Sequence, residues 1–174
     1  MEPILLSATE FCRLVDIDAK RFEQRRLRER AAADLRESID GERPYLLPIA
    51  PTEPGRHARF DWLDAVRMRS VVELERAGMS FGPACDFIRT SGMSAVLSHI
   101  GEGDFYVARW AVPGGTTRQS YGTAKDLSRA EPEAPLTSIR LNVSAIADDI
   151  ARRAAAQLGL AVRNGHFIEK DAAP

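Results

Sequence analysis

Between Ala19 and Arg30 the chain carries a dense set of cationic side chains at helical spacing. Six Lys and Arg residues stand there against Glu23 and Glu29, which gives the stretch a local charge of about +4. Cations gathered on one helix can neutralise phosphates, and Arg and Gln side chains can also hydrogen-bond to base edges. The stretch is therefore a candidate nucleic-acid contact. The alternative is a solvated helix face whose charges form surface ion pairs, for example between Arg25 or Arg26 and a neighbouring glutamate.

The residues just before this stretch predict how it is presented. Ser7 and Glu10 have the spacing of a capping box, which indicates that a short helix starts there. Asp18 is a suitable N-cap for a second helix that begins at Ala19. A short helix, a turn and a basic second helix form a helix-turn-helix, in which the second helix enters the major groove of DNA.

The following segment predicts two further features. On the second helix Phe22 and Leu27 are expected to face inward, and residues 31–43 extend its helical pattern. Residues 45–49 and 56–60 read as two short strands around a turn that contains proline and glycine. Such a β-hairpin has the shape of a wing.

Helices and strands are expected to alternate through the rest of the chain. Asp61 starts a helix that ends near Gly78, and Ser80 caps another. The β-forming residues of 105–112 predict a buried strand. The polar stretch 113–135, punctuated by glycine and proline, predicts a loop.

The C-terminal residues predict one more helix and a hairpin. Residues 138–143 alternate as a half-buried strand does, and Ser144 can cap a helix that ends at Gly159. The apolar stripe of this helix is either a dimer seam or packs on both predicted strands of its own chain. Asn164-Gly165 is typical of a hairpin turn. The stripe consists of Ile146, Ile150, Ala154 and Leu158.

Composition limits the classes of protein that the chain can belong to. Its 174 residues are 44% hydrophobic and 28% charged with a net charge of −1, so that any DNA binding must come from a local patch. Cys12 and Cys85 lie within apolar helical patterns and are expected to be buried thiols, as in a cytoplasmic protein. The N-terminus lacks a basic segment followed by an apolar run, and no stretch approaches 18 apolar residues, so we expect neither secretion nor membrane spanning. No histidine has metal-ligand spacing and no nucleophile motif occurs, so we expect neither an enzyme nor a cofactor.

Five short motifs occur in one order along the first half of the chain. They are Glu10–Leu14, Ile17-Asp18 with Phe22, His57–Phe60, Asp64, and Ala77–Phe81. In this order and spacing, residues 4–88 resemble the DNA-binding domain of the MerR family of bacterial transcription regulators. The resemblance implies a winged helix-turn-helix that binds double-stranded DNA, a homodimer, and RNA polymerase or another protein as a possible partner.

The chain also departs from the family pattern. Residues 29–43 add a helical stretch between the recognition helix and the wing. After Ile88 the sequence has glycines and a strand in place of the long helix through which family members pair. The usual dimer geometry, and the promoter untwisting that depends on it, do not carry over.

These patterns together predict an α+β protein. Residues 1–90 form a MerR-like DNA-binding headpiece, and residues 91–174 form a small α/β module for dimerisation, sensing or partner binding. The expected function is sequence-specific transcriptional regulation. The alternatives are a DNA-architectural or excisionase-like accessory protein, and a protein-interaction module without a DNA role. The expected base-edge contacts are Lys20, Arg21, Glu23 and Gln24, and the expected phosphate and minor-groove contacts are Arg13, Arg25, Arg28, Arg56, His57 and Arg59.

Overall fold

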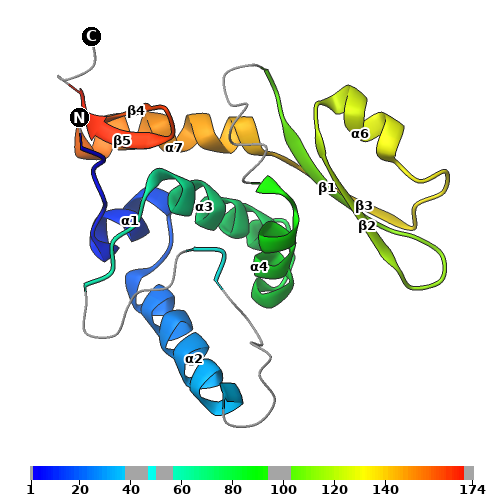
Figure 1. The fold of residues 1–174 in the computed structure, drawn as a ribbon, viewed down its shortest axis with the longest axis horizontal. Coiled ribbons are helices and arrows are strands. Elements are labelled where there is room, and N and C mark those ends of the chain that lie inside the picture. Colours follow the sequence, from blue (N-terminus) through cyan, green and yellow to red (C-terminus); the bar gives the residue numbers. More distant parts are fainter. Residues whose placement is uncertain (1, 38–46, 50–56, 94–102, 171–174) are drawn as a thin grey trace.

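The computed structural model describes residues 2–37, 47–49, 57–93 and 103–170 (Figure 1). Within these residues the chain is a mixed α+β protein with six helices and two small antiparallel sheets, which confirms the predicted fold class at that level. None of the described helices is both long and apolar enough to cross a membrane. The helices are α1 (Ala8–Val15), α2 (Ala19–Glu37), α3 (Trp62–Arg76), α4 (Phe81–Thr90), α6 (Ala124–Ala130) and α7 (Val143–Leu158). The strands are β1 (Tyr106–Ala111), β2 (Thr117–Gly122), β3 (Thr137–Asn142), β4 (Leu160–Arg163) and β5 (His166–Glu169).

Helix α1 and the turn after it form as the sequence predicts. The Ser7 side chain accepts from the backbone of Glu10 while the Glu10 carboxylate accepts from the backbone of Ser7, which is a complete capping box. Asp16 ends α1 in the left-handed conformation with φ of 62°, which Asp tolerates better than most residues. Asp18 Oδ1 then accepts from the backbone N–H of Arg21 at 2.8 Å and stabilises the start of α2.

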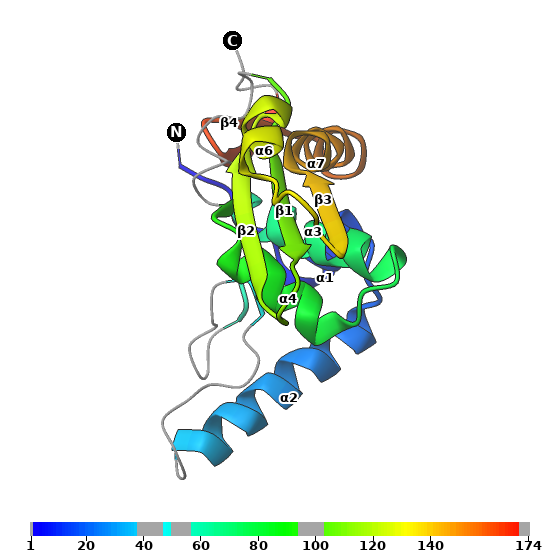
Figure 2. The same ribbon diagram turned by 90° about the vertical axis from the view of Figure 1, so that its right-hand side faces the viewer.

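Within the described part of the chain, the first turns of helix α2 pack on the other helices, and the rest of it extends away from them (Figures 1 and 2). Phe22 is buried, as predicted, whereas Leu27 is 53% exposed. The inward orientation predicted for Leu27 was therefore wrong. Leu27 lies on the exposed side of α2 at this level, whereas the neighbouring Arg26 is buried near the rings of Phe22 and Phe60.

The predicted wing lies mainly outside the described residues, because 38–46 and 50–56 are not part of them. Residues 47–49 are described and do not form a strand, so the prediction of a strand there was wrong. Phe60 pairs instead with Leu6 in an isolated antiparallel bridge, with N–O distances of 2.8 and 3.0 Å. The extended N-terminal segment thus takes the backbone hydrogen bonds that the hairpin was expected to use.

Helices α3 and α4 also follow the sequence pattern. Asp61 and Asp64 form a second capping box at the start of α3. Gly78, with φ of 94°, lies in the turn to α4, a conformation that glycine adopts without a steric penalty. Ser80 occupies the N-cap position of α4, although its side chain makes no capping hydrogen bond.

The three-stranded sheet has the order β2-β1-β3, and α6 packs on one of its faces (Figure 2). Strand β2 and helix α6 lie in the stretch that was predicted to be a loop, so that prediction was wrong. Strand β2 is a polar edge strand and lacks the apolar alternation by which strands are recognised. Thr123 and Asp126 form a capping box for α6, a sequence signal that the nearby glycines and prolines had obscured.

Helix α7 begins two residues earlier than expected, and its apolar stripe packs inside its own chain. The N-cap is Asn142, whereas Ser144 Oγ bridges Phe105 N and Gly103 O at 3.0 Å each. Ile150 and Ala154 are fully buried, and α7 lies against α1 and α3. The prediction that the stripe packs within its own chain is therefore confirmed, although α1 and α3 cover more of it than β1 does.

The chain ends in the predicted hairpin of β4 and β5. Asn164 and Gly165 have φ of 50° and 74°, the positive values that a type I′ turn requires. Phe167 of β5 forms a bridge with Ile4 and is fully buried. The main hydrophobic core therefore joins residues from both ends of the chain, and Leu6, Phe11, Ile150 and Phe167 all belong to it.

Candidate nucleic-acid interface

Three aromatic rings in mutual contact hold α1, α2 and the segment before α3 together. Phe11 of α1 lies 4.1 Å from Phe60 and 5.4 Å from Phe22 of α2 between ring centroids, and Phe22 lies 5.8 Å from Phe60. All three side chains are at most 1% exposed. Aromatic pairs at these distances stabilise a fold beyond the burial of their area. The cluster therefore fixes α1, the start of α2 and the segment that precedes α3 relative to one another.

The first turns of α2 present several of the predicted contact residues to solvent. Lys20, Gln24 and Arg28 are exposed, as is Glu23. Arg21 is also exposed, with 60% of its side chain accessible, although its Nη2 lies 3.1 Å from Glu75 Oε1 on α3. Among the residues that the structure describes, Lys20 and Arg28 have no ion-pair partner. These side chains have the exposure that a contact with DNA requires.

Arg25 differs from the other predicted phosphate contacts because only 11% of its side chain is exposed. Its guanidinium donates to both carboxylate oxygens of Glu75, at 3.0 and 2.7 Å. Its Cζ also lies 3.5 Å from the centroid of the Phe81 ring. The sequence had suggested a pairing of Arg25 with Glu23 or Glu29, whereas the observed partner is fifty positions away on another helix.

Arg13 and Arg26 are likewise engaged within the chain. Arg13 Nη2 donates at 2.8 Å to the carbonyl oxygen of Gln157, at the C-terminal end of α7, where a cation is favoured by the helix dipole. Arg26 pairs with Glu23 at 3.1 Å, one of the ion pairs that the sequence suggested, and lies near the rings of Phe22 and Phe60.

The predicted wing contacts are described only in part. Arg56 lies outside the described residues, while His57 and Arg59 are exposed. The Ser7 hydrogen bonds of the capping box lower the pKa of Glu10, and the positive charge of Arg59 lowers it further. Arg59 is therefore close enough to Glu10 on α1 for its positive charge to lower the pKa of that carboxyl.

Sequence reasoning did not identify Arg69, which anchors the turn between α1 and α2. Its side chain is only 8% exposed and pairs with Glu73 at 2.7 Å and with Asp16 and Asp149 at 3.5 Å each. It also donates to the carbonyl oxygen of Val15 at the end of α1. A charged residue within the otherwise buried run from Met68 to Val72 was the available signal. Arg69 thus connects α7 to the turn that precedes α2.

Asp16 has a second cationic partner in Arg76, at the end of α3. Their direct hydrogen bond lowers the pKa of the Asp16 carboxyl, and the charge of Arg69 contributes to the same shift. The left-handed residue of the turn therefore remains ionised well below neutral pH. These contacts hold the turn in place from the side of α3.

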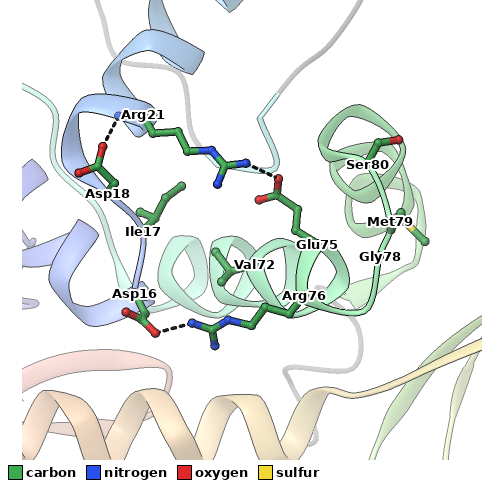
Figure 3. Close-up of a pocket in the computed structure, with 10 residues that line it drawn as sticks. All are labelled: Asp16, Ile17, Asp18, Arg21, Val72, Glu75, Arg76, Gly78, Met79 and Ser80. Atoms are coloured by element: carbon green, nitrogen blue, oxygen red, sulfur yellow. Dashed lines mark hydrogen bonds and ion pairs between the residues drawn. The ribbon is translucent and has the colours of Figure 1, made fainter.

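Beside this turn lies an open pocket of about 460 Å³ between the start of α2 and the junction of α3 with α4 (Figure 3). Arg21 extends across it to Glu75, and Arg76 reaches Asp16 along another wall. Ile17, Val72 and Met79 supply its apolar lining. Four of its charged side chains thus form two ion pairs, while Asp18 accepts from the backbone N–H of Arg21.

No family model matches the chain, and no curated protein matches it either. Its function therefore has to be inferred from its own residues. Among the described residues no group of three or more His, Cys, Asp or Glu side chains is arranged to hold a metal ion.

The buried thiol of Cys12 leads to a prediction about stability at alkaline pH. Desolvation raises the pKa of Cys12 from its ordinary 9.0 to about 11. Between these values the unfolded chain loses the thiol proton and the folded chain keeps it. We expect the free energy of unfolding to fall as pH rises through this window, by up to about 1.4 kcal/mol per pH unit from this group. Urea unfolding of the wild type and Cys12→Ala across this range measures the difference between their pH slopes. If the free energy of unfolding of both proteins changed equally with pH, the raised pKa of Cys12 would be contradicted.

Proposed function

We propose that the chain is a sequence-specific DNA-binding regulator that uses α1 and α2 as a MerR-like helix-turn-helix. In this proposal the first turns of α2 enter the major groove, where Arg can bind guanine and Gln can bind adenine. The support is local, because it comes from the described residues of the headpiece and from the resemblance of residues 4–88 to the family.

The observation that carries the proposal is the contrast between the two sides of α2. Phe22 is fully buried against Phe11 and Phe60, whereas Lys20, Arg21, Gln24 and Arg28 face solvent. A helix that is anchored by one side and carries cations on the other, and that also extends away from the body, fits a groove. Arg21, Arg25 and Arg26 pair with glutamates, whereas Lys20 and Arg28 have no carboxylate partner among the described residues, so surface ion pairing accounts for only part of the cations of α2.

The wing contributes a second contact in this proposal. His57 and Arg59 are exposed and directly precede Phe60, whose ring is held against α1 and α2. Contacts from this segment to the backbone or minor groove would set the orientation of α2, because phosphate contacts position a protein on the duplex.

A dimer remains part of the proposal for energetic reasons. A single headpiece buries too little surface for tight specific binding, so paired half-sites are expected. The apolar stripe of α7 is occupied within its own chain, and the seam must therefore be elsewhere. Half-site spacing in the bound DNA reports the dimer geometry directly.

Retention of genomic fragments by the purified protein at physiological salt tests the proposal, followed by binding titrations on the retained duplex. In this proposal Lys20 and Arg21, which the sequence alone placed at base edges, contact phosphates as Arg28 and Arg59 do. If each of the four neutralises one phosphate, log K against log salt has a slope of about −3.6 per protomer. A recurrent motif upstream of genes supports a regulator, and retention without sequence preference supports the architectural alternative. Binding that does not depend on salt would contradict a role of these cations in DNA contact.

A further inference from the structure

Glu75 of α3 lies between two arginines of α2 that the sequence does not distinguish. Arg21 and Arg25 are four positions apart, so they lie on the same face of the helix. Both donate to Glu75 Oε1, at 3.1 Å from Arg21 and 2.7 Å from Arg25. One carboxylate thus serves two guanidinium groups, and the three side chains together carry a net positive charge.

The two arginines are held very differently. Arg25 makes two parallel hydrogen bonds with Glu75, the fork that a planar guanidinium forms with a carboxylate, and it stacks on Phe81. Its side chain is 11% exposed. Arg21 makes one hydrogen bond to the same carboxylate, and 60% of its side chain is exposed. Solvent-exposed pairs of this second kind contribute little to stability.

We propose that Glu75 is a positioning residue that keeps Arg25 fixed between α2, α3 and α4. It also pairs with Arg21 in the free protein, until Arg21 binds DNA. Arg25 then makes no contact with DNA and instead sets the angle at which α2 leaves the body. Arg21 moves from Glu75 to the DNA when the complex forms. This inference rests on the proposed DNA-binding function.

The open space beside Arg21 is consistent with such a movement. Arg21 crosses the pocket between α2 and the α3–α4 junction, and only its guanidinium end is held (Figure 3). Its backbone N–H stays bonded to Asp18, so the side chain can leave Glu75 without disturbing the helix start. Glu75 does not become an isolated charge, because the fork with Arg25 remains.

A DNA phosphate offers Arg21 what Glu75 offers in the free protein, an anionic oxygen at hydrogen-bond distance. Glu75 therefore competes with DNA for Arg21. The competition lowers affinity for every sequence alike, while the fixed Arg25 preserves the orientation on which base recognition depends. Because it fixes Arg25 and lowers the affinity for every sequence, Glu75 favours specific over non-specific binding.

The matched variants Arg21→Gln and Arg25→Gln test the proposal, since each removes one positive charge from the same face of α2. Binding is measured on the retained duplex and on a scrambled duplex at several salt concentrations, at a temperature where circular dichroism shows each variant to be folded. We expect Arg21→Gln to reduce the steepness of the salt slope by about 0.9. We expect Arg25→Gln to leave the slope unchanged and to reduce the ratio of specific to non-specific affinity. Equal changes of slope in both variants would overturn the proposal.

Glu75→Gln gives an independent test of the competition. We expect it to raise affinity for the scrambled duplex by up to about five-fold, the factor that corresponds to release of one exposed ion pair. Unchanged or weaker binding of that duplex would overturn the proposed competition. Arg25→Lys keeps the charge but cannot form the fork, so it should also lose specificity at an unchanged salt slope. If Arg25→Lys bound both duplexes as the wild type does, the positioning role of the Arg25–Glu75 pair would be contradicted.

A measurement without DNA separates this inference from the proposed function. Double-mutant cycles on the free energy of unfolding should give a larger coupling for Arg25 with Glu75 than for Arg21 with Glu75. The reverse order would overturn the assignment of Arg25 as the fixed partner. If the wild type binds no DNA while the coupling order holds, the proposed function and the release of Arg21 both fail, and only the fixed Arg25–Glu75 contact remains.

Discussion

Replacement of three exposed cations of α2, in the triple variant Lys20→Ala, Arg21→Ala and Arg28→Ala, is expected to weaken DNA binding on the order of 100-fold at physiological salt. Each phosphate contact contributes about 0.9 to the slope of log K against log salt, and at about 0.15 M salt this amounts to roughly five-fold in affinity. Three such losses multiply. Fluorescence anisotropy with a labelled duplex measures the affinity, and the slope should become shallower by about 2.7 in the same experiment.

The control for this experiment is a variant that removes three positive charges from another part of the surface. Arg118, Lys125 and Arg129 are exposed on β2 and α6, which lie at a distance from α2 (Figure 1). Their replacement by alanine should change affinity only slightly, because exposed charges separated by more than a Debye length from the DNA are screened. If this control loses as much affinity as the α2 variant, DNA attraction is a property of total charge and not of α2.

The features that could be predicted from the sequence are those set by residues close together in the chain. Capping boxes at Ser7 and Asp61 fixed the starts of α1 and α3, because donor and acceptor are three positions apart. The turn at Asn164-Gly165 is equally local, since it needs positive φ at both positions. In each case the physical partners lie within one turn of backbone.

The same local rule explains one wrong prediction. Thr123 and Asp126 have capping-box spacing, so α6 was recognisable, but the density of glycine and proline around it favoured a loop. The sequence of strand β2 contains no comparable local signal. As an edge strand with an exposed face it needs few apolar residues, and it forms because β1 supplies the backbone partners.

The candidate interface could be predicted only as a set of residue types. Which arginines of α2 remain exposed depends on Glu75 and Phe81, which belong to helices that the sequence cannot place beside α2. Arg13 is likewise engaged by the end of α7, far along the chain. The division of the cations into exposed and engaged ones is thus a property of tertiary packing.

Removal of the Phe60 ring is expected to cause the largest loss of stability among single substitutions in the headpiece. Phe60 is 1% exposed and stacks at 4.1 Å on Phe11 while it meets Phe22 edge-on at 5.8 Å. Phe60→Ala should lower the free energy of unfolding by about 3–5 kcal/mol, because the cavity is bounded by rigid rings and cannot readily collapse. Urea unfolding followed by circular dichroism measures the change.

Two comparisons identify the cause of that loss. Phe60→Leu keeps most of the apolar volume and should recover a large part of the stability, whereas Leu136→Ala, at a side chain that is 68% exposed, should change it by less than about 0.5 kcal/mol. A cost for Phe60→Ala no larger than that of Leu136→Ala would mean that the three rings do not hold the headpiece. In that case the exposed cations of α2 would lack a fixed support, since Phe60 connects the N-terminal segment, α1 and α2 through its bridge with Leu6 and its two ring contacts.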